Sequence, residues 1–202
     1  MNAAPFESAS QALAFAFSFT MQQYDRPLVN RLADGPAREG KGLKGMDGAG
    51  QAAMIRRRVA KLTPLHQAVL VSRFAPAQID CACGRPCCRG KLPNFEWQAG
   101  IRLLAEYGER EALKGCSINR HLTLLVLRKL LGHKLQLADI ANTAGIAENT
   151  ASSHHAKLKA WFRGESLGRN GEAPKEGVEQ LAFAEIEAEL QEARIVGMHA
   201  AA

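Results

Sequence analysis

The sequence predicts an all-α protein, built as a helical bundle. In several segments apolar residues recur at three- and four-residue intervals, which is the spacing that gathers them on one face of a helix. Alanine and leucine are abundant, while only 2 Trp and 2 Tyr occur among the 202 residues. No segment shows a convincing strand pattern. Because 47% of the residues are hydrophobic, a packed core is expected.

Residues 1–46 are expected to hold an N-terminal helix and a flexible connection. The helix is predicted over residues 8–24, where apolar side chains recur every four residues (Leu13, Phe17 and Met21). The alternating phenylalanines of the same segment would also suit a strand. Residues 33–50 are rich in glycine, which predicts a loop between this helix and the next segment.

Residues 47–116 are predicted to form a helical body that contains a cluster of cysteines. Thr63 followed by Pro64 is a helix start signal, since threonine caps a helix and proline suits its first turn. Pro76 ends this helix. After the cysteines, a further helix is expected over residues 94–107.

Residues 117–165 carry the most informative pattern. Ser117 is expected to cap a helix that runs to Leu131. Beyond it, three residues fall where a helix-turn-helix unit needs a small residue, a turn residue and an apolar plug (Ala141, Gly145 and Ile146). The second helix should begin near Glu148–Asn149, and in such units this end enters the major groove of DNA.

The same segment resembles the promoter-reading fourth region of bacterial sigma factors. The likeness covers about residues 118–163 and depends on Asp139-Ile140-Ala141 and on Gly145-Ile146-Ala147-Glu148-Asn149-Thr150-Ala151. The family usually has Ser or Thr in place of Ala147 and Val in place of Ala151, and it lacks the His154-His155 pair. Without the usual cap at Ala147, Asn149 is an alternative cap for a helix that starts later.

This resemblance implies a set of DNA-contacting side chains on the second helix: Asn149, Thr150, Ser152, Ser153 and Lys157. Asparagine pairs with adenine, the hydroxyl groups contact bases or phosphates, and lysine neutralises phosphate. An ordinary helical hairpin of an all-α domain is the alternative interpretation. In either case the two histidines are interpreted as groove-facing or packing side chains.

Four of the five cysteines lie within eight residues: Cys81, Cys83, Cys87 and Cys88. Thiolates this close suit a structural zinc ion, which takes four ligands in a tetrahedron. Because Cys87 and Cys88 are adjacent, Cys116 or His121 is an alternative fourth ligand. Reduced thiols without a metal are the other interpretation.

Residues 166–202 are predicted to form a linker and an acidic amphipathic helix. Its apolar stripe has four-residue spacing (Val178, Ala182, Ile186 and Leu190). This segment carries a net charge of −4, so residues 1–165 carry +10 of the overall +6. A basic body attracts polyanions. The stripe is expected either to complete the core or to pack on a partner, such as a second subunit in a homodimer or RNA polymerase.

The helix-turn-helix, the basic body and the cysteines together resemble the architecture of phage Q-type late-gene antiterminators. The resemblance implies a DNA-binding transcription regulator of phage or prophage type that acts on double-stranded DNA and RNA polymerase. An initiation regulator or sigma-like factor is the alternative, and a protein–protein adaptor without DNA binding is the alternative of another class. No catalytic motif is found, so no enzyme is expected. A cytoplasmic location without a membrane partner is also expected.

Overall fold

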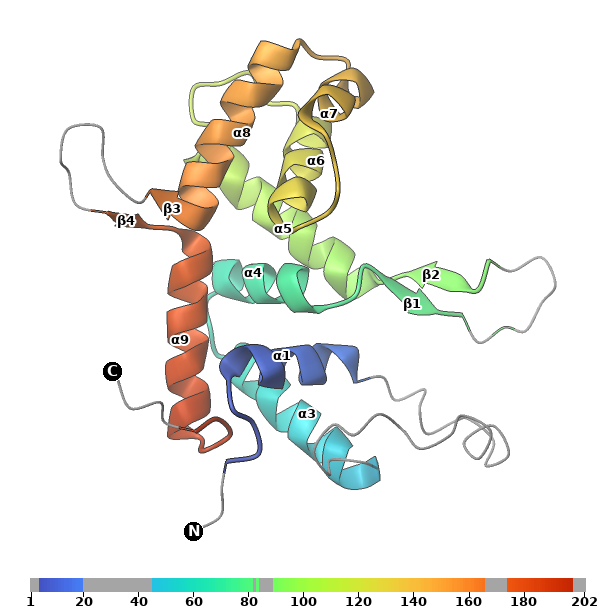
Figure 1. Cartoon of the computed structure of the whole chain (residues 1–202), viewed down its shortest axis with the longest axis vertical. Coiled ribbons are helices and arrows are strands. Elements are labelled where there is room, and N and C mark those ends of the chain that lie inside the picture. Colours follow the sequence, from blue (N-terminus) through green and yellow to red (C-terminus); the bar gives the residue numbers. More distant parts are fainter. Residues whose placement is uncertain (1–3, 20–44, 82, 84–88, 166–173, 198–202) are drawn as a thin grey trace. The chain divides into compact units, whose positions relative to one another are not determined.

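The computed structural model describes residues 4–19, 45–81, 83, 89–165 and 174–197. These residues form eight helices and two pairs of very short strands, and 66% helix confirms the all-α class. They group into two compact units. One unit comprises Met1–Leu62 and Glu185–Ala202, and the other comprises Thr63–Ala184. Figure 1 labels the elements.

In the first unit, α1 (Ala9–Ser18) packs against α3 (Gly45–Val59). Ser8 caps α1, because its hydroxyl accepts a hydrogen bond from the Gln11 amide at 3.3 Å. The described part of this helix ends at Ser18, and residues 20–24 of the predicted helix lie outside the described residues. Five side chains of α1 are buried (Ala9, Ala12, Leu13, Ala16 and Phe17), as its apolar spacing predicts.

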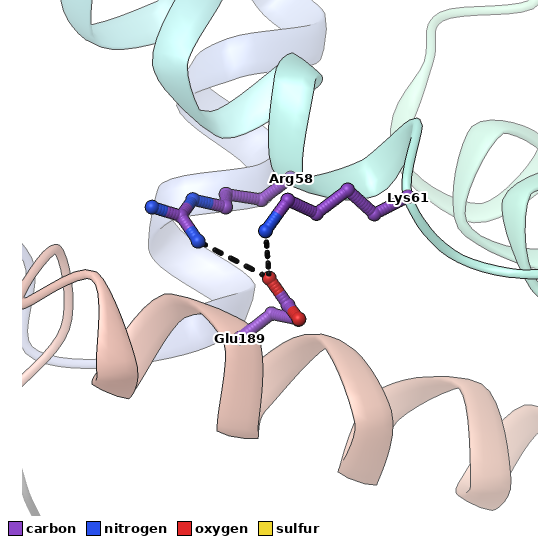
Figure 2. A network of polar contacts seen from close by, with 3 residues as sticks. All are labelled: Arg58, Lys61 and Glu189. Atoms are coloured by element: carbon purple, nitrogen blue, oxygen red, sulfur yellow. Dashed lines mark hydrogen bonds and ion pairs between the residues drawn. The ribbon is translucent and has the colours of Figure 1, made fainter.

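The same unit contains a charged contact between α3, the turn after it and α9 (Val178–Glu192). Figure 2 shows one carboxylate oxygen of Glu189 between Arg58 Nη1 at 3.3 Å and Lys61 Nζ at 3.2 Å. The hydrogen bond from Lys61 is the main reason that the pKa of Glu189 lies below its usual value. Opposite charges therefore hold the C-terminal half of α9 to its own unit.

The second unit begins with α4 (Pro64–Phe74), which starts where the sequence predicts. The Thr63 hydroxyl accepts from the His66 amide at 3.3 Å, and Pro64 occupies the first turn. A hairpin of β1 (Gln78–Asp80) and β2 (Lys91–Pro93) follows, with Ile79 opposite Leu92. The sequence showed no strand pattern here, because three residues per strand are too few for an alternating pattern to be recognised.

Two longer helices build the core of this unit. Asn94 caps α5 (Phe95–Glu111), which extends one turn beyond the predicted end at Tyr107. The next helix, α6 (Arg120–Leu130), is capped by Asn119 and not by Ser117 as predicted. The Asn119 side chain accepts from the Leu122 amide at 3.0 Å. Serine and asparagine are both good caps, so residue type alone does not predict which of the two residues caps the helix. The path of the chain after α5 determines it.

The connection from α8 (Glu148–Arg163) to α9 contains a very close backbone approach. Strand β3 (Gly164–Glu165) pairs antiparallel with β4 (Lys175–Glu176). A Cβ atom on Gly164 would lie 2.3 Å from the Lys175 carbonyl oxygen, and one on Gly177 would lie 2.2 Å from the Gly164 nitrogen. Only glycine fits at these two positions, because the obstacles are backbone atoms that have no rotamer to change.

The core of this unit gathers apolar side chains from α4, α5, α6, α7 (Leu137–Ala144), α8 and the start of α9. Val178 and Ala182 of α9 belong to this core. Ile186 and Leu190 are also buried, and they lie in the part of α9 that belongs to the first unit. The whole predicted stripe of α9 is therefore buried within the chain. This favours the expectation that it completes the core over the expectation that it docks on a partner.

Candidate nucleic-acid interface

The turn between α7 and α8 has a defined hydrogen-bond pattern around Gly145. This glycine adopts the left-handed conformation, with φ 66° and ψ 36°. Its amide donates to the Asn142 carbonyl at 3.1 Å, and the Ile146 amide donates to the Ala141 carbonyl at 3.0 Å. These two bonds are those of a Schellman motif, which satisfies the last carbonyls of a helix. The sequence pattern correctly placed the turn residue at Gly145.

The two apolar positions around the turn are also filled as predicted. Ala141 is fully buried, so a larger side chain would separate the helices. Ile146 is partly buried and packs against the core of the unit. Ile140, beside Ala141, is buried as well. The three-residue turn, residues 145–147, therefore fixes the direction in which α8 leaves the core.

The start of α8 differs from the alternative in which Asn149 caps a helix that starts later. The helix begins at Glu148, and Ala147 occupies the cap position without a side-chain hydrogen bond. The first turn includes Asn149, so this residue does not cap a later start. Its side chain is exposed. Asn149 is consequently available to a ligand outside the protein.

The buried and exposed sides of α8 separate clearly. Four residues point into the core: Ala151, His154, Leu158 and Phe162. Every predicted DNA-contacting residue is exposed on the other sides: Asn149, Thr150, Ser152, Ser153 and Lys157. We call these five residues the reading face. Residues three and four apart lie together on a helix, so their polar groups form one continuous surface.

One member of the reading face already has a partner. Lys157 Nζ lies 3.0 Å from Cys116 Sγ, in the loop between α5 and α6. The other side of α8 carries two cations that the sequence reasoning did not select, Lys159 and Arg163. Both are exposed. His155, Lys159 and Arg163 follow one another at four-residue intervals. This spacing, which places them on one side of the helix, is visible in the sequence.

The two adjacent histidines have different environments. His154 is only 4% exposed, and its Nδ1 has no hydrogen-bond partner among the described residues. Burial, followed by the nearby Lys157 charge, lowers the pKa of His154. Burial also lowers the pKa of His155, with smaller effects from Lys129, Lys159 and Arg163. His154 is thus a packing residue, while His155 lies half-buried at the side of the helix.

Two of the four predicted metal ligands lie directly after β1, in the connection from β1 to β2. Cys81 is half-buried and Cys83 is exposed, whereas Cys87 and Cys88 lie outside the described residues. The Cys81 amide donates to the Gly90 carbonyl at 2.9 Å, which closes the base of the loop. Among the residues that the structure describes, no group of three metal-ligating side chains is found.

The alternative ligands Cys116 and His121 lie far from this hairpin. The hairpin leads directly into α5 and points away from it, while Cys116 follows the other end of α5 (Figure 1). The 17 residues of α5 span about 25 Å at 1.5 Å per residue. A zinc–sulfur bond is about 2.3 Å long. Neither alternative ligand can therefore join Cys81 and Cys83 around one ion.

Within the described residues, every helix is too short or too polar to cross a lipid bilayer. Comparisons of the chain with protein-family models, with curated proteins and with solved structures found no match.

Proposed function

We propose that this protein binds double-stranded DNA, with α7 and α8 acting as a helix-turn-helix unit and α8 lying in the major groove. The observation that carries the proposal is the exposure of all five residues of the reading face on a helix that the core holds from behind. A recognition helix needs both features: a rigid buried side and a polar side that meets base edges.

The chemistry of the reading face suits the edges of bases. Asn149 lies in the first turn of α8, where its amide group has the donor and acceptor that match adenine. Ser152 and Ser153 offer hydroxyl groups, which act both as donors and as acceptors. Lys157 adds a positive charge for phosphate. The carboxylate of Glu148 is the one acidic group of α8 and lies at its start.

The proposed role in the cell is transcription regulation. It is supported by the likeness of residues 139–151 to the fourth region of sigma factors, together with the left-handed turn at Gly145 and the partly buried Ile146. Antitermination in the manner of Q-type proteins, with RNA polymerase as partner, is the more specific form of this proposal. A helical adaptor without DNA binding is the competing function, and it requires no affinity for nucleic acid.

A structural zinc ion in the connection from β1 to β2 is part of the same proposal. Cys81 and Cys83 lie at the start of the loop between β1 and β2, where the Cys81 amide donates a hydrogen bond to the Gly90 carbonyl. Thiolates are preferred zinc donors. Cys81, Cys83, Cys87 and Cys88 would hold the ion, which would stabilise the loop without taking part in a reaction.

The test is binding of the full-length protein to duplex DNA at several salt concentrations. A helix-turn-helix protein should bind random duplex with an affinity that falls steeply between about 50 and 200 mM salt, since counterions are released. Duplexes selected from a random pool should then bind more tightly and share a sequence. Absence of binding at low salt would contradict the DNA proposal and favour the adaptor.

A further inference from the structure

A hollow of about 510 Å³ lies beside the reading face, between the end of α6, the loop to α7 and the second half of α8. Six of its lining residues carry a basic or imidazole side chain: Lys129, His133, Lys134, His155, Lys159 and Arg163. The remaining lining is apolar or uncharged, and none of the described residues that line it is acidic. We call this hollow the basic pocket.

Two of the cations build the walls of the basic pocket. Lys129 Nζ donates a hydrogen bond to the Leu135 carbonyl, and Arg163 donates one to the Leu130 carbonyl. Both carbonyls belong to the chain around Gly132, which adopts a left-handed φ of 101° after α6. The first bond ties the loop to α6, and the second ties α8 to the end of α6, so hydrogen bonds within the protein hold both walls of the pocket.

The other two lysines of the basic pocket have no charged partner among the described residues. Lys134 and Lys159 are exposed, and among the described residues neither makes an ion pair or a hydrogen bond through its side chain. Each ammonium group has three donors, which in this structure are left to solvent or to a ligand. The pocket therefore combines two structural cations with two available ones.

Repulsion within the basic pocket is visible at His155. Burial is the main reason that the pKa of this histidine is lowered, and the charges of Lys129, Lys159 and Arg163 lower it further. Positive groups from α6 and α8 thus act on one imidazole without an acid to compensate. A bound anion would relieve this repulsion, because it adds the missing opposite charge.

We propose that the basic pocket binds phosphate groups of the DNA backbone at the edge of the groove that α8 enters. This inference rests on the proposed function. His155 and Lys159 lie on the same helix as Ser152, at successive spacings of three and four residues, so a duplex that meets the reading face passes the pocket. Phosphate is the anion that lysine and arginine recognise on nucleic acid, and such contacts set the register of the protein on the duplex.

The test uses a double substitution of the two available cations, Lys134→Gln with Lys159→Gln. The matched control is Lys91→Gln with Lys175→Gln, which removes two exposed lysines of the same unit that lie on strands outside the pocket. Unchanged thermal unfolding shows that the variants fold. Removal of one phosphate-binding cation reduces the slope of log affinity against log salt by about 0.9. The slope of the pocket variant should fall by about 0.9 to 1.8, and the control should keep the wild-type slope.

A second measurement examines the pocket without DNA. Inorganic pyrophosphate, added at constant ionic strength, should shift the backbone amide resonances of residues 132–136 and 155–159 in the wild type but not in the pocket variant. If wild-type DNA binding is normal and the pocket variant matches it in slope, the inference is wrong while the proposed function stands. If pyrophosphate shifts these resonances but no duplex binds, the proposed function fails and the pocket serves a free phosphorylated compound instead of DNA.

Discussion

Lys157 on the reading face contacts Cys116, with 3.0 Å between Nζ and Sγ. The contact joins α8 to the loop that precedes α6. The lysine remains exposed and retains donors for a second partner.

Lys157→Ala should weaken binding to every duplex by a similar factor and reduce the salt slope by about 0.9, because a phosphate contact carries no sequence information. Cys116→Ala is the matched control, since it removes the thiol and keeps the charge. This control should leave the salt slope unchanged. A loss confined to the selected sequence would contradict the phosphate role of Lys157. Both measurements use fluorescence anisotropy over a range of salt.

Asn149→Ala or Ser153→Ala should reduce the affinity for the selected duplex by about 1–3 kcal/mol, which is typical when a hydrogen bond to a base is removed. Binding to random duplex should change little. Ser10→Ala, on the exposed side of α1 in the other unit, is the control and should alter neither affinity. Equal losses on selected and random DNA would exclude base reading by these two residues.

Gly145→Ala should lower the free energy of unfolding by about 1–2 kcal/mol, because alanine is strained at a φ of 66°. Nothing lies within 4 Å of the added Cβ, so the cost would be conformational and not steric. Gly50→Ala in α3 also meets nothing within 4 Å, but it has ordinary helical backbone. That control should stabilise the protein by about 0.5–1 kcal/mol. Urea unfolding distinguishes them, and equal effects would refute the turn geometry.

The stability of the protein should fall as the pH drops below about 6.5, the ordinary pKa of histidine. The pKa of buried His154 is lowered by burial and by Lys157, so the unfolded chain binds more protons than the folded one below this pH. The stabilisation is complete above the unfolded pKa and is lost as the pH falls through the lower folded value. His154→Leu should reduce this loss between about pH 7.5 and 5.5. The same pH dependence in both proteins would show that another group causes it.

Protein purified without added metal should contain about one equivalent of zinc, released by a chelator together with loosening of the connection from β1 to β2. Cys81→Ser with Cys83→Ser should abolish the metal content. Cys116→Ser is the control and should retain it, because α5 separates Cys116 from the hairpin. Elemental analysis that finds no zinc in the wild type would eliminate the metal proposal.

Local signals in the sequence were sufficient for several elements. The Thr63–Pro64 start of α4, the Gly145 turn and the apolar stripe of α9 each depend on chemistry within a few residues of the chain. The five exposed residues of the reading face follow from the same periodicity once the start of α8 is known.

Features that depend on distant contacts were not predictable in this way. The β1–β2 and β3–β4 pairs have two or three residues per strand, too few for a strand pattern. The basic pocket joins three segments that only folding brings together. The contact of Lys157 with Cys116 spans 41 positions, and nothing in either local sequence indicates it.

The backbone approach of Gly164 and Gly177 separates the positioning of α8 and α9 from the length of the chain that connects them. The β3–β4 pair and the two glycines hold the end of α8 and the start of α9 together, so the chain between Glu165 and Lys175 begins and ends at one place. The entropy of closing a loop grows slowly, by about 0.6 kcal/mol for each doubling of its length. A fluorescent reporter domain inserted between these strands should therefore leave both helices intact.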